Sequence, residues 1–369
     1  MSIINLKSPT DLSGFYVVYN GSTNLEKKGI YGISHLMEHL VCKALDPYQD
    51  EMDRLGITSN AYTSKNEIVF HMTGLDESLS KWRNKYVDLL QTFDISKKEF
   101  ENEKMIVLQE YQDSFNEQTQ NHWLNLDRKL LNSYGAIGLK EDLESLTYLD
   151  CLNYFEQQYL LPTKIINVSK NIEFGTDIKF MNDTVNTVHK LGDYDVKIDR
   201  NTEYKDKVSL ILSSDIFEKD FAVINFVNLM LTYGLNSPFY QEIREKRGLV
   251  YYIGAYLSRM NKQGMNYFYT ATTGDNVDKI NEIIFTIFDD IELFLTKKRF
   301  DIVKDALKIK YKTNDINRYS NVDKYISDKE WSVSDIIDDL SYLDVLRVAK
   351  KYFKKDEYRI SRDDQEFKK

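Results

Sequence analysis

Two histidines and a glutamate stand close together in the segment His35-Leu-Met-Glu-His39. On an α-helix, His35 and His39 lie on one face a single turn apart, so their imidazoles can bind the same metal ion. Glu38 falls on the same side and can reach a water molecule held by that metal. Two nitrogen ligands beside a carboxylate, in the order H-x-x-E-H, are typical of a hydrolytic zinc site. The alternative is a surface helix with two chance histidines, which is disfavoured because the 369 residues include only 5 His.

A catalytic zinc ion usually has three protein ligands, so a third must come from elsewhere in the chain. Cys42 follows His39 by three residues on the same helical face. It lies about 7 Å further along the helix axis than the midpoint of the two histidines, which is too far for a compact tetrahedral site. We therefore interpret Cys42 as a small buried residue.

A better source of the third ligand is the segment 96–118, where Ser96 and Glu99 form a capping-box signature. Glu103 and Glu110 are seven residues apart, two helical turns, and therefore share a face. Acidic residues on a helix are usually solvated, but a pair on one face can also supply a metal ligand and a supporting carboxylate. Spacing alone leaves both interpretations open. The apolar residues of the segment recur at helical spacing: Phe100, Ile106, Val107, Tyr111 and Phe115.

The H-x-x-E-H helix followed by Glu103-Lys-Met-Ile-Val-Leu-Gln-Glu110 resembles the pitrilysin/insulinase family of inverzincin metallopeptidases. The likeness is greatest to the branch that contains mitochondrial processing peptidase and its small bacterial relatives. In that family the distal glutamate of the E-x6-E pair is the third zinc ligand, and the proximal one supports the site. The resemblance thus implies Zn²⁺ held by His35, His39 and Glu110, with Glu103 as a catalytic residue that supports them. The gap between the two motifs is shorter than usual for the family, which we attribute to trimmed loops and strands.

The segment between the two metal motifs has strand composition, interrupted by turn residues. An ordinary hairpin is the simplest interpretation. In the family, however, the N-A-x-T segment forms an exposed edge strand beside the zinc, to which an extended peptide adds by main-chain hydrogen bonds. The resemblance therefore implies substrate binding by Asn60, Ala61, Tyr62 and Thr63. We expect His71, in the following strand, to be a packed core histidine rather than a ligand.

The elements that must position these residues indicate an α+β fold. The length suggests two domains of similar size, and a polar stretch at about 171–206 separates the two halves. The order strand, helix, strands, helices appears twice, although no direct sequence repeat is apparent. The resemblance implies two similar domains of the processing-peptidase type, each a mostly antiparallel sheet packed with helices, which together form half of a clamshell. The other predicted elements are a helix from Thr147 to Tyr159 ended by Pro162, strands at 165–168 and 208–212, and a helix at 221–231.

We predict an N-terminal zinc-binding catalytic domain over residues 1–180 and a C-terminal domain over 190–369. The second half has no histidine after His189, so it cannot repeat the metal site. It carries instead the segment 237–251, which matches the C-terminal motif of the family with Arg244 and Tyr251 at its two functional positions. An arginine offers fixed donors to a substrate carbonyl, and a tyrosine hydroxyl can stabilise an oxyanion. The alternative is a surface helix with solvated Lys246 and Arg247, ended by Gly248.

These residues together predict a zinc-dependent endopeptidase that hydrolyses short or unfolded peptides. Glu38 is expected to act as general base on the zinc-bound water, and Arg244 and Tyr251 to act as catalytic and substrate-binding residues. The alternative is a non-catalytic or partner-dependent structural subunit of the same fold, a kind of relative whose metal motifs are typically eroded. Because both motif sets lie on one chain, we expect a self-sufficient homodimer.

Composition excludes several other classes of protein. The net charge of −9 argues against sequence-independent binding of nucleic acid. No apolar run approaches membrane-spanning length, and the first residues lack a basic, apolar signal. Cys42 and Cys151 offer no disulfide framework, which favours a reducing cytoplasm.

Overall fold

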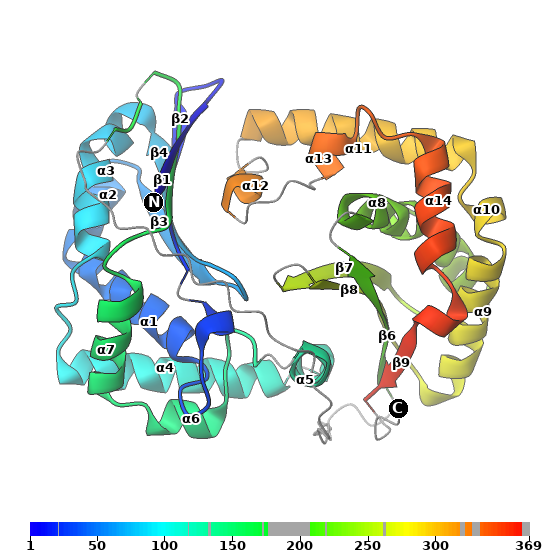
Figure 1. The fold of residues 1–369 in the computed structure, drawn as a ribbon, viewed down its shortest axis with the longest axis horizontal. Helices are drawn as coiled ribbons and strands as arrows, with labels where there is room; N and C mark the ends of the chain where they lie inside the picture. Colours follow the sequence, from blue (N-terminus) through cyan, green and yellow to red (C-terminus); the bar gives the residue numbers. More distant parts are fainter. Residues whose placement is uncertain are drawn as a thin grey trace. The chain divides into compact units, whose positions relative to one another are not determined.

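The computed structural model places the chain in two compact units, shown as a ribbon in Figure 1. The first comprises the described residues of Met1–Ser114, Leu126–Tyr194 and Asn314–Lys329, and the second those of Phe115–Asn125, Asp195–Thr313 and Glu330–Lys369. Most of the predicted polar separator, 176–206, lies outside the described residues. The structure describes residues 1–20, 22–116, 118–131, 134–171, 173–175, 207–217, 220–260, 263–317, 322–326 and 333–363.

The first unit contains a five-stranded sheet in the order β1-β5-β2-β4-β3. β1 and β5 are parallel, and the other neighbours are antiparallel. β3 is an edge strand, so its outer side has no neighbouring strand in this sheet. The predicted strand at 165–168 is confirmed as part of β5. The strands are β1 (Ser2–Lys7), β2 (Leu12–Tyr19), β3 (Thr58–Thr63), β4 (Ile68–Leu75) and β5 (Lys164–Ser169).

Both faces of this sheet are covered. Phe15 and Val17 of β2 belong to the main core of the unit, where they pack with residues of the helices. Tyr16 and Val18, which alternate with them, pack on the opposite face against a short helix, α12 (Val322–Ile326). Because successive side chains of a strand point to opposite faces, a strand covered on both sides has a continuous run of apolar and aromatic residues, as β2 has from Phe15 to Tyr19.

Two helices of the first unit, α4 and α7, begin where the sequence predicts. α4 starts after Ser96, whose hydroxyl accepts the Glu99 N–H at 3.2 Å while the Glu99 carboxylate accepts the Ser96 N–H at 2.8 Å. Thr147 and Asp150 form the same capping box at α7. The bounds are α1 (Ile33–Cys42), α2 (Gln49–Arg54), α3 (Asp76–Leu90), α4 (Lys97–Asn116), α6 (Lys140–Ser145) and α7 (Tyr148–Gln158), and α5 (Gln118–Leu131) belongs partly to each unit.

The predicted apolar face of α4 is confirmed at three positions and is wrong at one. Phe100 and Val107 are buried and Tyr111 is half-buried, whereas Ile106 is 46% exposed. Each helical residue is rotated by about 100° from the one before it, so the neighbour of the buried Val107 points away from the core. The side chain of Phe115 lies outside the described residues.

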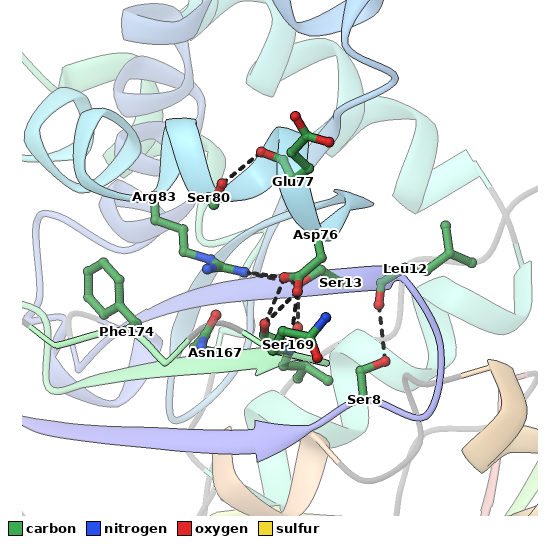
Figure 2. A network of polar contacts seen from close by, with 12 residues as sticks. Ser8, Leu12, Ser13, Asp76, Glu77, Ser80, Arg83, Asn167, Ser169 and Phe174 are labelled. Atoms are coloured by element: carbon green, nitrogen blue, oxygen red, sulfur yellow. Dashed lines mark hydrogen bonds and ion pairs between the residues drawn. The ribbon is translucent and has the colours of Figure 1, made fainter.

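A buried polar network fastens the first turn of α3 to two strands of the sheet (Figure 2). The Asp76 carboxylate accepts hydrogen bonds from Arg83 at 2.8 Å, from Ser13 of β2 at 3.1 Å and from Ser169 of β5 at 2.7 Å. Both charged side chains are nearly inaccessible, so each depends on the other for compensation of its charge.

The second unit contains a four-stranded antiparallel sheet in the order β7-β8-β6-β9. The predicted strand at 208–212 and helix at 221–231 are confirmed as β6 and α8. The strands are β6 (Val208–Phe217), β7 (Ile253–Met260), β8 (Gln263–Thr272) and β9 (Arg359–Arg362). The helices are α8 (Phe221–Thr232), α9 (Val277–Asp289), α10 (Ile291–Phe294), most of α11 (Lys297–Asn317), α13 (Val333–Ile336) and α14 (Tyr342–Tyr352).

The two units repeat one plan, which confirms the predicted pair of similar α+β units. The order β3-β4-β2-β5 in the first sheet corresponds to β7-β8-β6-β9 in the second. Only a short match of residues accompanies this likeness of plan: α4 begins Lys-Lys-Glu-Phe at residues 97–100, and α11 begins Lys-Lys-Arg-Phe at 297–300. Within the described part of the chain, no helix combines the length and apolar character needed to cross a membrane.

Candidate metal centre

The two histidines of the H-x-x-E-H motif project from α1 as neighbours. The centroids of the His35 and His39 rings are 4.8 Å apart and their planes are perpendicular. α1 begins at Gly32, which has a φ of +100° and no side chain to cap the helix. A side chain at this position would also meet Leu143, because a Cβ would lie 2.7 Å from its Cδ2. The start of the metal-binding helix is therefore fixed by close packing.

Glu26 replaces the missing cap, and sequence reasoning missed it. Its carboxylate accepts the N–H groups of Gly32 and Ser34, each at 2.9 Å, and the side chain is buried. Burial raises the pKa of Glu26 to about 7, while the hydrogen bonds from Gly32 and Ser34 lower it. In its ionised form a carboxylate at a helix N-terminus is stabilised by the helix dipole. An acidic residue shortly before the glycine of α1 is the only sequence signal for this contact.

Glu110 of α4 meets both histidines. Its Oε2 lies 3.4 Å from His35 Nε2, and its Oε1 lies 3.8 Å from His39 Nε2. One ligand atom from each residue lies within 4.8 Å of the others, and no other such group of three is found among the residues that the structure describes. Ligand atoms about 2.0 to 2.2 Å from a tetrahedral zinc ion are roughly 3.4 Å apart, so this donor set fits zinc.

The protonation of His35 also suits a metal ligand. Burial, with a smaller contribution from His39, lowers the pKa of His35 to about 4. The imidazole is therefore neutral at neutral pH, which is the form that binds a metal. Cys42 is partly buried and does not belong to the group of three, as its position along the helix indicates.

Glu103, two helical turns before Glu110, approaches the far side of His39. Its Oε2 lies 3.2 Å from His39 Nδ1, and Lys43 Nζ lies 3.6 Å from its Oε1. A hydrogen bond at Nδ1 leaves Nε2 of the ring for a metal and fixes the ring orientation. The Nδ1 of His35 is buried and has no comparable partner in the described part of the chain.

Glu38 lies on α1 between the two histidines and is only 9% exposed. Thr63 Oγ1 donates a hydrogen bond of 2.6 Å to its Oε2. Burial raises the pKa of Glu38, while the hydrogen bonds from Thr63 lower it. The carboxylate is thus held beside the metal-binding group in a site that favours its taking up a proton.

The predicted peptide-binding segment forms β3 and therefore lies at the edge of the sheet. Tyr62 is 39% exposed, and the Asn60 side chain accepts the N–H of Ala61 at 2.9 Å. The Thr63 side chain faces Glu38 instead of solvent. His71 lies in β4, half-buried and stacked on Tyr16, and is not part of the metal-binding group.

The C-terminal motif lies in the second unit. Arg244 belongs to η5, a short π-helical segment (Tyr240–Glu245), and its guanidinium lies 4.4 Å from the ring centroid of Tyr240 and 5.1 Å from that of Tyr251. The Tyr251 side chain is 79% exposed. The structure therefore brings together the two residues at the functional positions of this motif.

The basic residues that follow Arg244 are only partly as predicted. Lys246 and Arg247 are exposed, but both pair with Glu242, at 2.5 and 2.9 Å. A spacing of four residues on a helical segment brings Lys246 and Glu242 together. Gly248, with a φ of +61°, ends the segment as expected for a C-terminal glycine.

Two domain models of one peptidase family match this chain. The model described as Insulinase (Peptidase family M16) matches residues 6–133, and the one described as Peptidase M16 inactive domain matches residues 164–307. Together the two models match more than half of the chain. The model of the N-terminal domain matches the first half, and that of the C-terminal domain matches the second half. The chain belongs to peptidase family M16.

Full-length relatives agree with this assignment. The chain is 22% identical to an uncharacterised zinc protease of Rickettsia felis, over 87% of this chain and 85% of the relative. It is 24% identical to an uncharacterised zinc protease of Bacillus subtilis, over 88% and 85%. A probable mitochondrial-processing peptidase subunit beta of Arabidopsis thaliana is 23% identical over 44% of this chain and 32% of its own length.

A solved structure with the same fold is that of a protease from Helicobacter pylori. It aligns with a TM-score of 0.81 and 17% identity, over 98% of this chain and 96% of the other. At this level of identity the likeness establishes the fold, a pair of sheets packed with helices.

Proposed function

We propose that the protein is a zinc-dependent endopeptidase that hydrolyses short or unfolded peptides. The observation that carries the proposal is the convergence of His35, His39 and Glu110 on one point, with the Glu38 carboxylate beside them on α1. A structural metal site usually has four protein ligands, whereas a set of three leaves a position for a reactant. The names of the relatives, zinc proteases, support the same class of reaction.

In this proposal each residue has one role. Zinc held by His35, His39 and Glu110 supplies a Lewis acid that polarises a carbonyl and makes water more acidic. Glu38 takes the proton of the attacking water and delivers it to the leaving amine. Glu103 holds the His39 ring in its orientation through Nδ1.

The peptide itself is proposed to bind in two places. An extended chain adds to the free edge of β3 along Asn60, Ala61, Tyr62 and Thr63, as edge strands permit. Arg244 and Tyr251 bind the peptide backbone and the developing oxyanion. Binding through the main chain requires an extended segment, which supports the proposal of short or unfolded substrates.

The rival function is a non-catalytic subunit, and the match of residues 164–307 to an inactive domain gives it a basis. That match covers the second half of the chain, where Arg244 and Tyr251 lie. The complete metal-binding group lies outside it, in the first half. The presence of all three ligands and the base therefore favours the enzyme.

The decisive experiment compares Glu38→Gln with Glu101→Gln, a change at an exposed glutamate of α4. We expect Glu38→Gln to retain about one zinc per chain and to lose peptide hydrolysis by roughly 10²- to 10⁴-fold, the usual contribution of a general base. Glu101→Gln should match the wild type in both respects. Unchanged cleavage by Glu38→Gln would refute the proposed mechanism.

We also propose a cytoplasmic homodimer in which Arg244 and Tyr251 of one copy serve the metal centre of the other. Closed twofold pairing is the commonest oligomer. The test mixes Glu38→Gln with Arg244→Ala/Tyr251→Phe, each nearly inactive alone, under conditions of subunit exchange. Activity should reappear, because one site of the mixed dimer has all its residues. Confirmed exchange without activity would mean that each chain completes its own site.

A further inference from the structure

Thr63 occupies an unusual place, as the last residue of the edge strand β3 and the partner of the Glu38 side chain. The distance of 2.6 Å from Oγ1 to Oε2 is at the short end of the range for O–H···O hydrogen bonds, as expected for a charged acceptor. Thr63 is half-buried and Glu38 is buried, so water competes poorly for this contact. The contact joins the strand proposed to bind the peptide to the group proposed to act as base.

Thr63 supplies the hydrogen bond that the Glu38 side chain receives within the described part of the chain. The donor is the Thr63 hydroxyl, and the acceptor is Oε2 of Glu38. The terminal torsion of a glutamate is broad and roughly twofold, so an unrestrained carboxylate rotates easily. One short bond to Oε2 selects an orientation and leaves Oε1 free to accept a proton from water.

We propose that Thr63 is a positioning residue that orients the Glu38 carboxylate for catalysis and couples this orientation to the occupation of β3 by a peptide. The inference rests on the proposed function, because it requires Glu38 to be the base. It gives the Thr63 side chain a different role from the rest of the edge strand. Asn60, Ala61 and Tyr62 bind the peptide, whereas the Thr63 hydroxyl acts on the base.

The coupling follows from the position of Thr63 in the sheet. Its neighbour in β4 is Ile68, and its other side is the free edge of the sheet. In the sheet alone, the last residue of β3 is held from one side only, by β4. A peptide that adds to the outer edge of β3 restrains this residue from the other side as well. The hydroxyl that donates to Glu38 is restrained with it, so the base is oriented when substrate is bound.

The experiment replaces Thr63 by valine, which keeps the shape of the side chain and removes the hydroxyl. Thr63→Ser is the rescue variant, and Thr63→Ala is a second test if the valine alters folding. Thr58→Val is the matched control, because Thr58 lies in the same strand and its hydroxyl bonds the Thr73 hydroxyl at 2.7 Å. Each variant is characterised by kcat, KM, zinc content and midpoint of thermal unfolding.

We expect Thr63→Val to lower kcat about 10- to 100-fold, the effect of losing one hydrogen bond to a charged group. KM and zinc content should stay near the wild-type values, Thr63→Ser should recover most of the rate, and Thr58→Val should match the wild type. A rise in KM at unchanged kcat would overturn the proposal, since it would make the hydroxyl a substrate contact. Equal losses in Thr63→Val and Thr58→Val would also overturn it, because they would show a general effect on the strand.

A second arm separates this inference from the proposed function. In a Glu38→Gln background, Thr63→Val should cause no further loss of rate, because residues that act as a unit are not additive. Peptide affinity, measured by titration calorimetry in the same background, should be equal with and without the Thr63→Val substitution. Full activity of Glu38→Gln would refute the function itself, whereas additive losses in the double variant would refute only the role of Thr63.

Discussion

The two units of this chain use one scaffold for different chemistry. In both, a helix of about twenty residues follows a hairpin and shorter helical segments: α4 follows α3 in the first unit, and α11 follows α9 and α10 in the second. Ser96 accepts the N–H of Glu99 at the start of α4, and Thr296 accepts that of Arg299 at the start of α11, each at 3.2 Å. The backbone plan therefore does not decide which unit can bind a metal.

The difference lies in single side chains at corresponding positions. Where α4 has Glu103 and Glu110, α11 has Val303 and Lys310. Val303 is fully buried in the core of the second unit, and Lys310 is exposed. A valine cannot orient a histidine, and a lysine cannot share a cation with two imidazoles. The comparison thus assigns metal binding to a few residues that the shared scaffold merely positions.

The largest effect is expected when α4 loses the carboxylates that α11 lacks at the corresponding positions. Glu103→Gln should lower zinc affinity about 10- to 100-fold, as is usual for a residue that orients a ligand. Glu110→Gln should lower it further, because it removes a ligand. Lys310→Gln, at the corresponding position of α11, is the control and should leave the zinc content unchanged.

Zinc content after dialysis against a mild chelator gives the ranking. If Glu103→Gln lost more metal than Glu110→Gln, the roles of the two glutamates would have to be exchanged. If Lys310→Gln lost metal as well, the second unit would contribute to zinc binding and the contrast between the units would fail.

How much of the fold and of the candidate site the sequence predicts depends on how far apart in the chain the contacting residues lie. The helices α1 and α4 and the edge strand were predictable because periodicity, caps and a family resemblance are local signals. Glu26 was missed because it caps α1 through backbone N–H groups that only the folded loop presents. The bond between Ser169 and Asp76 joins residues 93 positions apart, and no pattern within a window reveals such a pair.

The repeat of the two units was predictable from the order of their elements but not from matching residues. Core packing requires only apolar residues of suitable size, so the two sequences diverged while the strand order stayed the same. The short Lys-Lys-x-Phe match at 97–100 and 297–300 is separated by 200 positions and becomes significant only once α4 and α11 are seen in equivalent places.

A second difference between the units concerns the cation that compensates the negative charge of a buried aspartate. Asp76 pairs with Arg83, and both side chains are less than 10% exposed. Asp220 is equally buried, but its partner Lys351 is 43% exposed, and the Tyr352 hydroxyl also donates to Asp220 at 2.6 Å. Arg83→Met should therefore destabilise the protein by about 3 to 5 kcal/mol, the cost of leaving a buried charge unpaired.

Lys351→Met should cost no more than about 1 kcal/mol, as for a pair near the surface. The measurement is denaturant unfolding of both variants beside the wild type, with the signal of each transition followed separately. Similar losses in the two variants would show that exposure of the cation does not control the strength of these pairs.

The smallest effects test whether corresponding contacts in the two units contribute equally to the free energy of unfolding. Lys104 donates to the carbonyls of Glu144 and Leu146, just before the capped start of α7. Lys304 donates to those of Asp338 and Leu340, just before α14. Each lysine thus ties its long helix to the same point of the next capped helix.

Lys104→Met and Lys304→Met should each cost roughly 1 kcal/mol, because each removes hydrogen bonds to backbone carbonyls at a partly exposed site. The two variants should differ in zinc affinity. Lys104 follows Glu103 directly and lies six residues before Glu110, so a shift of α4 moves both carboxylates relative to the histidines. Lys304→Met leaves that geometry intact. Unfolding midpoints and zinc affinity, measured on the same samples, separate the two effects. Equal zinc affinity in both variants would mean that packing of α4 against α1 fixes the metal site without help from this lysine.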